Sequence, residues 1–308
     1  MQKPLKLAAP VQGIAEGGTA TCDLAIGPRY FSLMLKAVVK KASGTPVLAD
    51  ILGTLRVKLN GLTVREITAT RLDTINTQYG AEFAANSTDD NSDTGNHKVT
   101  FYLPIFFAEP WRKSYAAVEA MAWPTVFTNG SRVVSLNSFQ LEFEVPADAG
   151  AVLSLQAIEV YAETDSGVGG LDSNGNPVLN ISHWKTLSWN YGAAGQTIIN
   201  TLEKAGLYQE IHFFTTTDTI TDVEVEVDGA IKHKAPKAVN DLNLVTWGMY
   251  ESGLSATRFD LIFDRSDFPV DALNVNGVKD FQVKPTLSGT SSTTMTMVTM
   301  VFKSAYKG

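Results

Sequence analysis

Four histidines carry the most familiar catalytic and metal-binding chemistry in this chain of 308 residues, and their spacing predicts neither role. No two of them have the spacing of a zinc site, and none belongs to a recognisable nucleophile arrangement. The chain also contains no phosphate loop of the G-x-x-x-x-G-K type and no dinucleotide fingerprint. We therefore predict that the protein is not an enzyme and has no catalytic residue, bound metal or cofactor. The histidines are His97, His183, His212 and His233.

One polar segment has the alternation of a calcium-binding loop. Asp172, Asn174 and Asn176 alternate as oxygen ligands do at the start of such a loop. However, the glycine falls at the fourth position instead of the sixth, and His183 stands where the closing glutamate belongs. This pattern favours a polar turn, and the acidic run Asp89–Asp93 favours a solvated loop.

Composition excludes several classes of protein. The chain is 44% hydrophobic and 19% charged, with a net charge of -7, whereas a protein that coats nucleic acid needs clustered Lys and Arg. A single cysteine, Cys22, excludes an intrachain disulfide. No segment approaches the roughly 18 to 20 apolar residues of a membrane span, and the first residues lack the apolar run of a signal peptide. We expect a protein made and kept in a cytoplasm-like compartment.

The chain contains two internal repeats in the same order. Leu55–Gly61 lies nineteen residues before Tyr79, and Val223–Gly229 lies nineteen residues before Trp247. A second pair aligns Phe139 to Val160 with Phe281 to Phe302 without a gap. Ordered repeats of this length indicate one duplicated β-domain.

The second repeat predicts an irregularity in both copies. The apolar alternation changes parity after Leu155 in the first copy and after Met297 in the second. A one-residue slip turns the later side chains to the other face unless an extra residue is accommodated. We therefore predict a shared β-bulge.

The elements that position these residues are mostly short strands with period-two alternation, so the chain is predicted to be all-β. Ala69 to Gln78 and Ala238 to Thr246 are predicted to be equivalent short helices. Further helical segments are expected from Pro110 to Ala122 and from Phe268 to Leu273, each with a proline near its start.

Two segments are predicted to lie outside the strand framework. Residues 84–97 are polar and acidic and have no counterpart in the second copy, so we expect a surface loop. The Gly-rich and Asn-rich segment 166–182 is expected to be a linker between an N-terminal domain, residues 1–165, and a C-terminal domain, residues 183–308.

The ordered set of motifs resembles the major capsid protein of corticoviruses, tailless bacteriophages with an icosahedral coat over an internal membrane. The resemblance is carried by Pro10-Val11 and Ala20–Tyr30, by Leu59-Asn60-Gly61, by Val225–Gly229, by the region of Trp184, by Trp247-Gly248 and by the final alternating strand. It covers nearly the whole chain in order.

This resemblance implies a double jelly roll, with two eight-stranded antiparallel sandwiches in tandem and a helix between the sixth and seventh strands of each. The segments from Pro110 and Pro269 lie where those helices are expected. It further implies a homotrimer with a pseudo-hexagonal outline in a virion capsid, made in the host bacterial cytoplasm. The implied partners are neighbouring capsomers, a separate vertex or penton protein, and an internal lipid membrane or its proteins, with no direct contact to nucleic acid.

One hypothesis about interface residues comes from the repeat itself. Arg56 and Lys58 in the first copy align with Glu224 and Glu226 in the second, so equivalent outer faces carry opposite charge. If these faces meet between subunits, the alternation favours correct pairing of neighbours.

Two alternatives fit the same β-rich pattern. A secreted-type double jelly-roll glycan hydrolase or amidase would need acidic side chains that converge between its sandwiches. A carbohydrate-binding β-sandwich would need exposed aromatic side chains, and the aromatic-rich stretch from Phe101 to Phe127 supplies candidates. Core packing of these aromatics is the competing interpretation.

Overall fold

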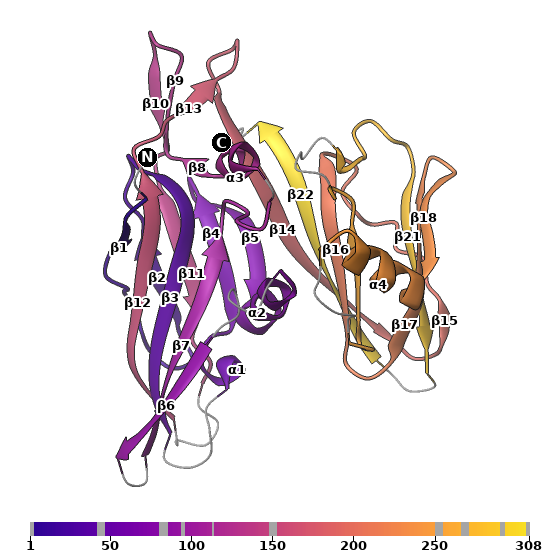
Figure 1. The fold of residues 1–308 in the computed structure, drawn as a ribbon, viewed down its shortest axis with the longest axis horizontal. Coiled ribbons are helices and arrows are strands. Elements are labelled where there is room, and N and C mark those ends of the chain that lie inside the picture. The colour runs from indigo at the N-terminus through magenta and orange to yellow at the C-terminus, as the bar shows by residue number, and fades with distance from the viewer. Residues whose placement is uncertain are drawn as a thin grey trace. The chain divides into compact units, whose positions relative to one another are not determined.

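The chain forms two compact units, shown in Figure 1. The computed structural model describes residues 3–41, 47–79, 86–93, 96–112, 114–147, 153–249, 255–265, 271–289 and 293–305. The first domain comprises Met1–Ile181 with Ser304–Gly308, and the second domain comprises Ser182–Lys303. The boundary between them falls inside a single strand, β14 (Pro177–Tyr191).

Two antiparallel sheets form the framework of the first domain (Figure 1). One sheet has the order β1 (Leu5–Leu7), β12 (Leu153–Asp165), β3 (Arg29–Lys41), β7 (Asn96–Phe106) and β6 (Asn86–Asp93). The other contains β2 (Thr19–Asp23), β11 (Phe139–Glu144), β4 (Thr54–Leu59) and β5 (Leu62–Thr68). Smaller elements are α1 (Leu48–Ile51), α2 (Ala69–Gln78), α3 (Tyr115–Ala120), β8 (Trp123–Pro124), β9 (Val126–Thr128), β10 (Val133–Ser135) and β13 (Gly169–Leu171).

The second domain repeats this arrangement. One sheet contains β14, β22 (Thr293–Ala305), β16 (Leu207–Thr215) and β19 (Arg258–Ile262), and β20 (Leu273–Asn274) also pairs with β16. The other sheet has the order β15 (Gly195–Gln196), β21 (Phe281–Ser288), β17 (Thr219–Val227) and β18 (Ala230–Pro236). Helix α4 (Lys237–Thr246) follows β18 directly, as α2 follows β5.

Among the described residues, eight strands in each domain follow the jelly-roll order. The strands outside this order are β6, β8, β9, β10 and β13 in the first domain and β20 in the second. The predicted all-β double jelly roll is therefore confirmed. Alternation explains the core: along β4 and β11 every second residue is an apolar side chain buried between the sheets, and the intervening residues are polar or charged.

Helices α2 and α4 lie where the repeat predicts them, with α4 beginning one residue earlier than expected. They follow the fifth framework strand of each domain. The helix expected from Pro110 is shorter than predicted: α3 follows the sixth framework strand but begins at Tyr115, where the Ser114 hydroxyl accepts a hydrogen bond from the Ala117 N–H at 3.2 Å. The first half of the counterpart expected from Phe268 to Leu273 falls outside the described residues, and its last residue, Leu273, begins β20.

The repeated hairpin turn has the same geometry in both domains. Asn60 and Asp228 adopt positive φ angles of 49° and 48°, and Gly61 and Gly229 follow at 80° and 78°. Two successive positive φ angles define the two-residue turn whose twist matches paired strands. The side chain of Asn60 accepts hydrogen bonds from two backbone N–H groups that precede β11, and that of Asp228 does the same before β21.

An aromatic pair is also repeated. The hydroxyl of Tyr30 donates to the Ala25 carbonyl, and that of Tyr208 donates to the Glu203 carbonyl, each over 2.8 Å and five residues. Their rings lie 4.9 Å from those of Phe139 and Phe281 respectively. Together with the turns, these contacts show that the two copies share details of structure as well as strand order.

The predicted bulge is present in the first domain and displaced in the second. The register of β12 against β3 shifts between Leu155 and Ala157, as the change of parity requires. In the second domain the shift against β22 lies on β16, between Tyr208 and Glu210. The change of parity after Met297 has a different cause, because Met295 and all residues from Met297 to Phe302 are buried, so this part of β22 is covered on both faces.

Two segments expected to be irregular contain strands. The expected loop 84–97 includes β6, which pairs with β7 despite its Asn-rich and Asp-rich sequence. Its polar residues suit an edge strand, because charge discourages pairing with other chains. The expected linker 166–182 contains β13 and the start of β14, which form an antiparallel pair. In both cases pairing with a neighbouring strand overrides weak local propensity.

Candidate assembly surfaces

The predicted interface residues of the first domain lie on the outer side of β4. Arg56 pairs with Glu144 at 2.8 Å, with Glu66 at 3.3 Å and with Glu142 at 3.4 Å, and Lys58 also pairs with Glu142. These glutamates lie on the two strands that flank β4, which are β5 and β11. Two cations on a central strand are thus surrounded by acids from both neighbours.

The second domain carries the same ladder with its signs reversed. Glu224 on β17 pairs with Lys234 of β18 at 2.7 Å and with Lys284 of β21 at 3.1 Å. Lys284 also pairs with Glu226. Hydrogen bonds from Lys234 and Lys284 lower the pKa of Glu224, and hydrogen bonds to Glu226 and Glu224 raise that of Lys284.

All four predicted residues therefore have partners within their own domain. We call the two sets the β4 ladder and the β17 ladder. The sequence analysis missed the partner residues, although the second repeat contains a signal for them: Glu142 aligns with Lys284, so the flanking strand reverses its charge together with the central one. Whether the ladders also meet neighbouring subunits stays a hypothesis.

The histidine with the strongest electrostatic environment is completely buried. His212 on β16 lies 2.8 Å from Glu210 and 3.0 Å from Asp260 of β19, and Arg258 pairs with Asp260 at 2.5 Å. Burial alone would lower the pKa of His212, but the two carboxylates outweigh it and raise the pKa to about 9. Because His212 and Asp260 are 0% exposed, this quartet has a structural role and no access to substrate.

Two of the other histidines have described side chains, and neither lies in the environment of a catalytic site. Burial and the charge of Arg265 lower the pKa of His233 to about 4. His183 lines a small pocket, and the side chain of His97 lies outside those described. Among the described residues, no group of three His, Cys, Asp or Glu side chains could hold a metal ion.

The calcium-like segment is closed by its own hydrogen bonds. The carboxylate of Asp172 accepts bonds of 2.8 Å from the backbone N–H groups of Asn174 and Asn176, and one of 3.1 Å from the Asn176 side chain. This is the geometry of a polar turn.

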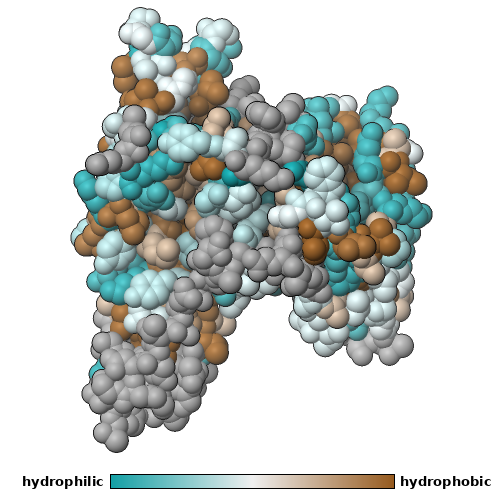
Figure 2. All heavy atoms as spheres, in the orientation of Figure 1, coloured by the Kyte–Doolittle hydropathy of each residue, from teal (hydrophilic) through white to brown (hydrophobic). Residues whose placement is uncertain are grey.

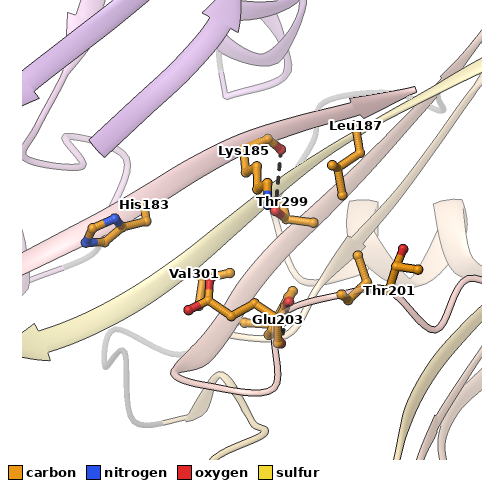
Figure 3. Close-up of a pocket in the computed structure, with 9 residues that line it drawn as sticks. His183, Lys185, Leu187, Thr201, Glu203, Thr299 and Val301 are labelled. Carbon is orange, nitrogen blue, oxygen red and sulfur yellow. Dashed lines mark hydrogen bonds between the residues drawn. The ribbon is translucent and has the colours of Figure 1, made fainter. Parts of the chain in front are cut away.

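The pocket lined by His183 is too small for a substrate. Figure 3 shows Lys185 of β14 beside Thr299 of β22, with the Thr299 hydroxyl 3.4 Å from the Lys185 carbonyl oxygen. The pocket has a volume of about 30 Å³. That is room for roughly one water, whereas ligand pockets have about 300 to 1,000 Å³.

A larger groove in the first domain is open to solvent and contains one carboxylate. It has a volume of about 490 Å³ and is lined in part by Lys6 and Asp165. The carboxylate of Asp165 is 0% exposed and is bound to Arg29 at 2.5 Å. A glycosidase needs a pair of carboxylates around its substrate, so this groove does not provide a hydrolytic site.

Half of the predicted aromatic platform belongs to the core. Phe107, Trp123 and Phe127 are at most 1% exposed, and the rings of Phe107 and Trp123 stack at 4.4 Å. Tyr115 is 60% exposed. Core packing is therefore the correct interpretation for the buried members of this stretch. Within the described part of the chain, no helix is long and apolar enough to cross a membrane.

Comparison with known proteins agrees with the jelly-roll order and with the presence of two domains. The family model of the viral coat protein P2 N-terminal domain matches residues 5–165, and that of the viral coat protein P2 C-terminal domain matches residues 181–304. The chain belongs to the viral coat protein P2 family. It is a viral major capsid protein, and the two family models correspond to the two jelly rolls.

Solved capsid proteins share this fold. The major capsid protein P2 from bacteriophage PM2 is 16% identical, with 99% of this chain and 100% of that chain covered and a TM-score of 0.70. A structure of Sulfolobus Turreted Icosahedral Virus is 11% identical, with coverages of 99% and 92% and a TM-score of 0.68. The Faustovirus major capsid protein is 8% identical, with coverages of 98% and 90% and a TM-score of 0.68. No curated protein sequence shows significant similarity to the chain.

Proposed function

We propose that this coat protein forms the icosahedral shell of a tailless bacteriophage with an internal membrane, and that its capsomer is a homotrimer with a pseudo-hexagonal outline. The observation that carries the proposal is the equivalence of the two domains, which extends to the turns at Asn60 and Asp228. Three such chains present six similar corners. A near-sixfold tile can pack a flat facet, while the differences between the domains keep its edges distinct.

The proposed role is structural and not enzymatic. The protein would act by trimerisation and tiling, with neighbouring capsomers, a separate vertex protein and an internal membrane or its proteins as partners. Its location would be the virion, after synthesis in the cytoplasm of a bacterial host. The net charge of -7 supports a coat that does not contact nucleic acid directly.

The two ladders would contribute to the choice of neighbour more than to stability. Each cation and acid of the hypothesis already has a partner in its own sheet, and exposed ion pairs contribute about 0 to 1 kcal/mol. Their outer atoms still present opposite patterns of charge, which would disfavour misregistered contacts.

Sedimentation of the purified protein tests the proposal. Three chains of 33.3 kDa give a species of about 100 kDa, which we expect to persist at micromolar concentration. A monomer under these conditions would contradict the capsomer that we propose.

A further inference from the structure

Helix α4 has an exposed apolar face that the described residues of its domain leave uncovered. Val239, Leu242 and Trp247 are 57%, 68% and 52% exposed. Val239 and Leu242 are three residues apart, so they lie on one side of the helix, and Trp247 caps its C-terminal end. Figure 2 shows hydrophobic atoms gathered over α4 on the visible face of the second domain. We call these three residues the α4 patch.

The equivalent helix of the first domain, α2, has a polar face toward solvent. The exposed positions of α2 are Thr70, Thr74 and Thr77. The hydroxyls of Thr74 and Thr77 donate to backbone carbonyls four residues earlier, at 2.7 and 2.8 Å. The buried sides of the two helices are alike, since Asn76 of α2 and Asn240 of α4 each donate to a backbone carbonyl of the adjacent sheet. The outer faces therefore differ in polarity although each buried side packs on its own sheet, so packing within the domain does not require the α4 patch to be apolar.

The charges around the patch distinguish between possible occupants. Lys237 pairs with Asp241 at 2.8 Å, and Lys234 pairs with Glu224 at 2.7 Å. An anionic membrane surface attracts lysines that have no acidic partner. Because these adjoining lysines are neutralised, the patch suits the apolar core of a protein contact better than a lipid surface.

The size of the patch indicates the kind of protein contact. Three partly exposed side chains present on the order of 300 Å² of apolar surface. A stable two-protein interface buries about 800 Å² on each partner. A patch of this size is therefore insufficient for an isolated dimer and suits one of several simultaneous contacts in a closed assembly, where linked contacts reinforce one another.

We propose that the α4 patch is a contact between copies of this chain in the assembled coat. The inference rests on the proposed capsid function and adds the surface through which copies meet. Because α2 lacks an equivalent patch, only the second domain of each copy brings this surface to the contact. Trp247 is the expected anchor, since tryptophan is enriched among the residues that dominate binding energy.

The test compares two matched double variants. Val239→Gln with Leu242→Gln makes the outer face of α4 polar while keeping a good helix former. Thr74→Gln with Thr77→Gln introduces the same residue on the exposed face of α2. Sedimentation measures the concentration at which half of the protein associates into capsomers, and electron microscopy with light scattering measures the concentration for half-maximal formation of larger shells.

We expect the α4 variant to need at least a tenfold higher concentration in one of these two steps, with its thermal unfolding and circular dichroism unchanged, and the α2 variant to match the wild type. Unchanged midpoints in both steps overturn the inference while the wild-type assembly leaves the proposed function intact. A wild type that stays monomeric overturns both. Flotation with phosphatidylglycerol vesicles separates the lipid alternative: loss of flotation in the α4 variant with normal assembly also overturns the inference.

Discussion

The outer faces of β4 and β17 carry equivalent ladders of ion pairs with opposite signs of charge. In the first domain the central strand carries Arg56 and Lys58, and acids flank it. In the second domain the central strand carries Glu224 and Glu226, and lysines flank it. Cross-strand pairs of opposite charge stabilise a sheet whichever strand carries the cation. The two copies of the fold therefore share the pairing of opposite charges across strands, whereas the sign of the charge on the central strand differs between them.

The other sheets of the two domains differ in how deeply their ion pairs are buried, and not in the sign of the charges. In the first domain, Lys36 and Glu159 pair at 3.0 Å across β3 and β12, with side chains 29% and 38% exposed. In the second domain, the quartet of Glu210, His212, Arg258 and Asp260 is buried. Exposed pairs contribute little, whereas a buried charge that loses its partner is strongly destabilising. We therefore expect the same type of mutation to have unequal effects in the two domains.

Removal of Asp260 should give the largest effect. Asp260→Ala leaves two buried cations, His212 and Arg258, with one fewer acid, and we expect a loss of about 3 to 5 kcal/mol in the free energy of unfolding. Glu159→Ala is the matched change in the first domain and should cost roughly 0 to 1 kcal/mol. Urea denaturation measures both. Equal losses of stability in the two variants would show that burial does not make the ion pairs of one sheet more important for stability than those of the other.

Alkaline pH should also destabilise the second domain. An unfolded histidine has a pKa of about 6.5, whereas folding raises that of His212 to about 9. The stabilisation is complete below pH 6.5 and is lost as the pH rises through 9, by up to about 3 kcal/mol. Urea denaturation at pH 6 and pH 9.5 should show this loss in the wild type and less of it in His212→Gln. The same slope in both proteins would assign the loss to other groups.

The repeated turns should respond equally to mutation. Asn60→Ala and Asp228→Ala each remove an acceptor for two backbone N–H groups and place alanine at positive φ. We expect each to cost about 1 to 3 kcal/mol in the free energy of unfolding. Glycine at either position should recover the part due to backbone strain. A difference above about 2 kcal/mol between the two alanine variants would argue against equivalent turns.

Reversal of the β4 ladder should have the smallest effect on stability. Arg56→Glu with Lys58→Glu places like charges side by side and should cost about 1 to 2 kcal/mol. Addition of Glu142→Lys places a cation where the second domain has Lys284 and should recover part of that loss. Thermal unfolding at low and high salt measures the difference, which salt should reduce. No recovery in the triple variant would mean that the sign of this ladder is fixed by something beyond pairing.

The strand framework was predictable because its signal is local and repeated. Alternation along β4 and β17, the glycines after Asn60 and Asp228, and the ungapped second repeat all report backbone geometry that one segment determines. The helices α2 and α4 followed from the same alignment. The bulge at β12 was also predictable, because a change of parity in the apolar alternation of one strand has one simple structural cause.

The remaining features depend on contacts between distant residues. Nothing near β6 indicates that β7 will pair with an Asn-rich and Asp-rich segment. Two of the partners of Arg56, Glu142 and Glu144, lie more than eighty residues along the chain, and the quartet around His212 joins residues almost fifty positions apart. Burial of both faces of β22, which hid the cause of its parity change, is likewise a property of the assembled sheet.

Electron cryo-microscopy of the purified capsomer tests most directly whether the two domains act as similar corners of one tile. We predict a threefold particle of three chains in which six jelly rolls alternate around the axis to give a pseudo-hexagonal outline. A monomer, or a ring in which the first and second domains do not alternate, would contradict the account.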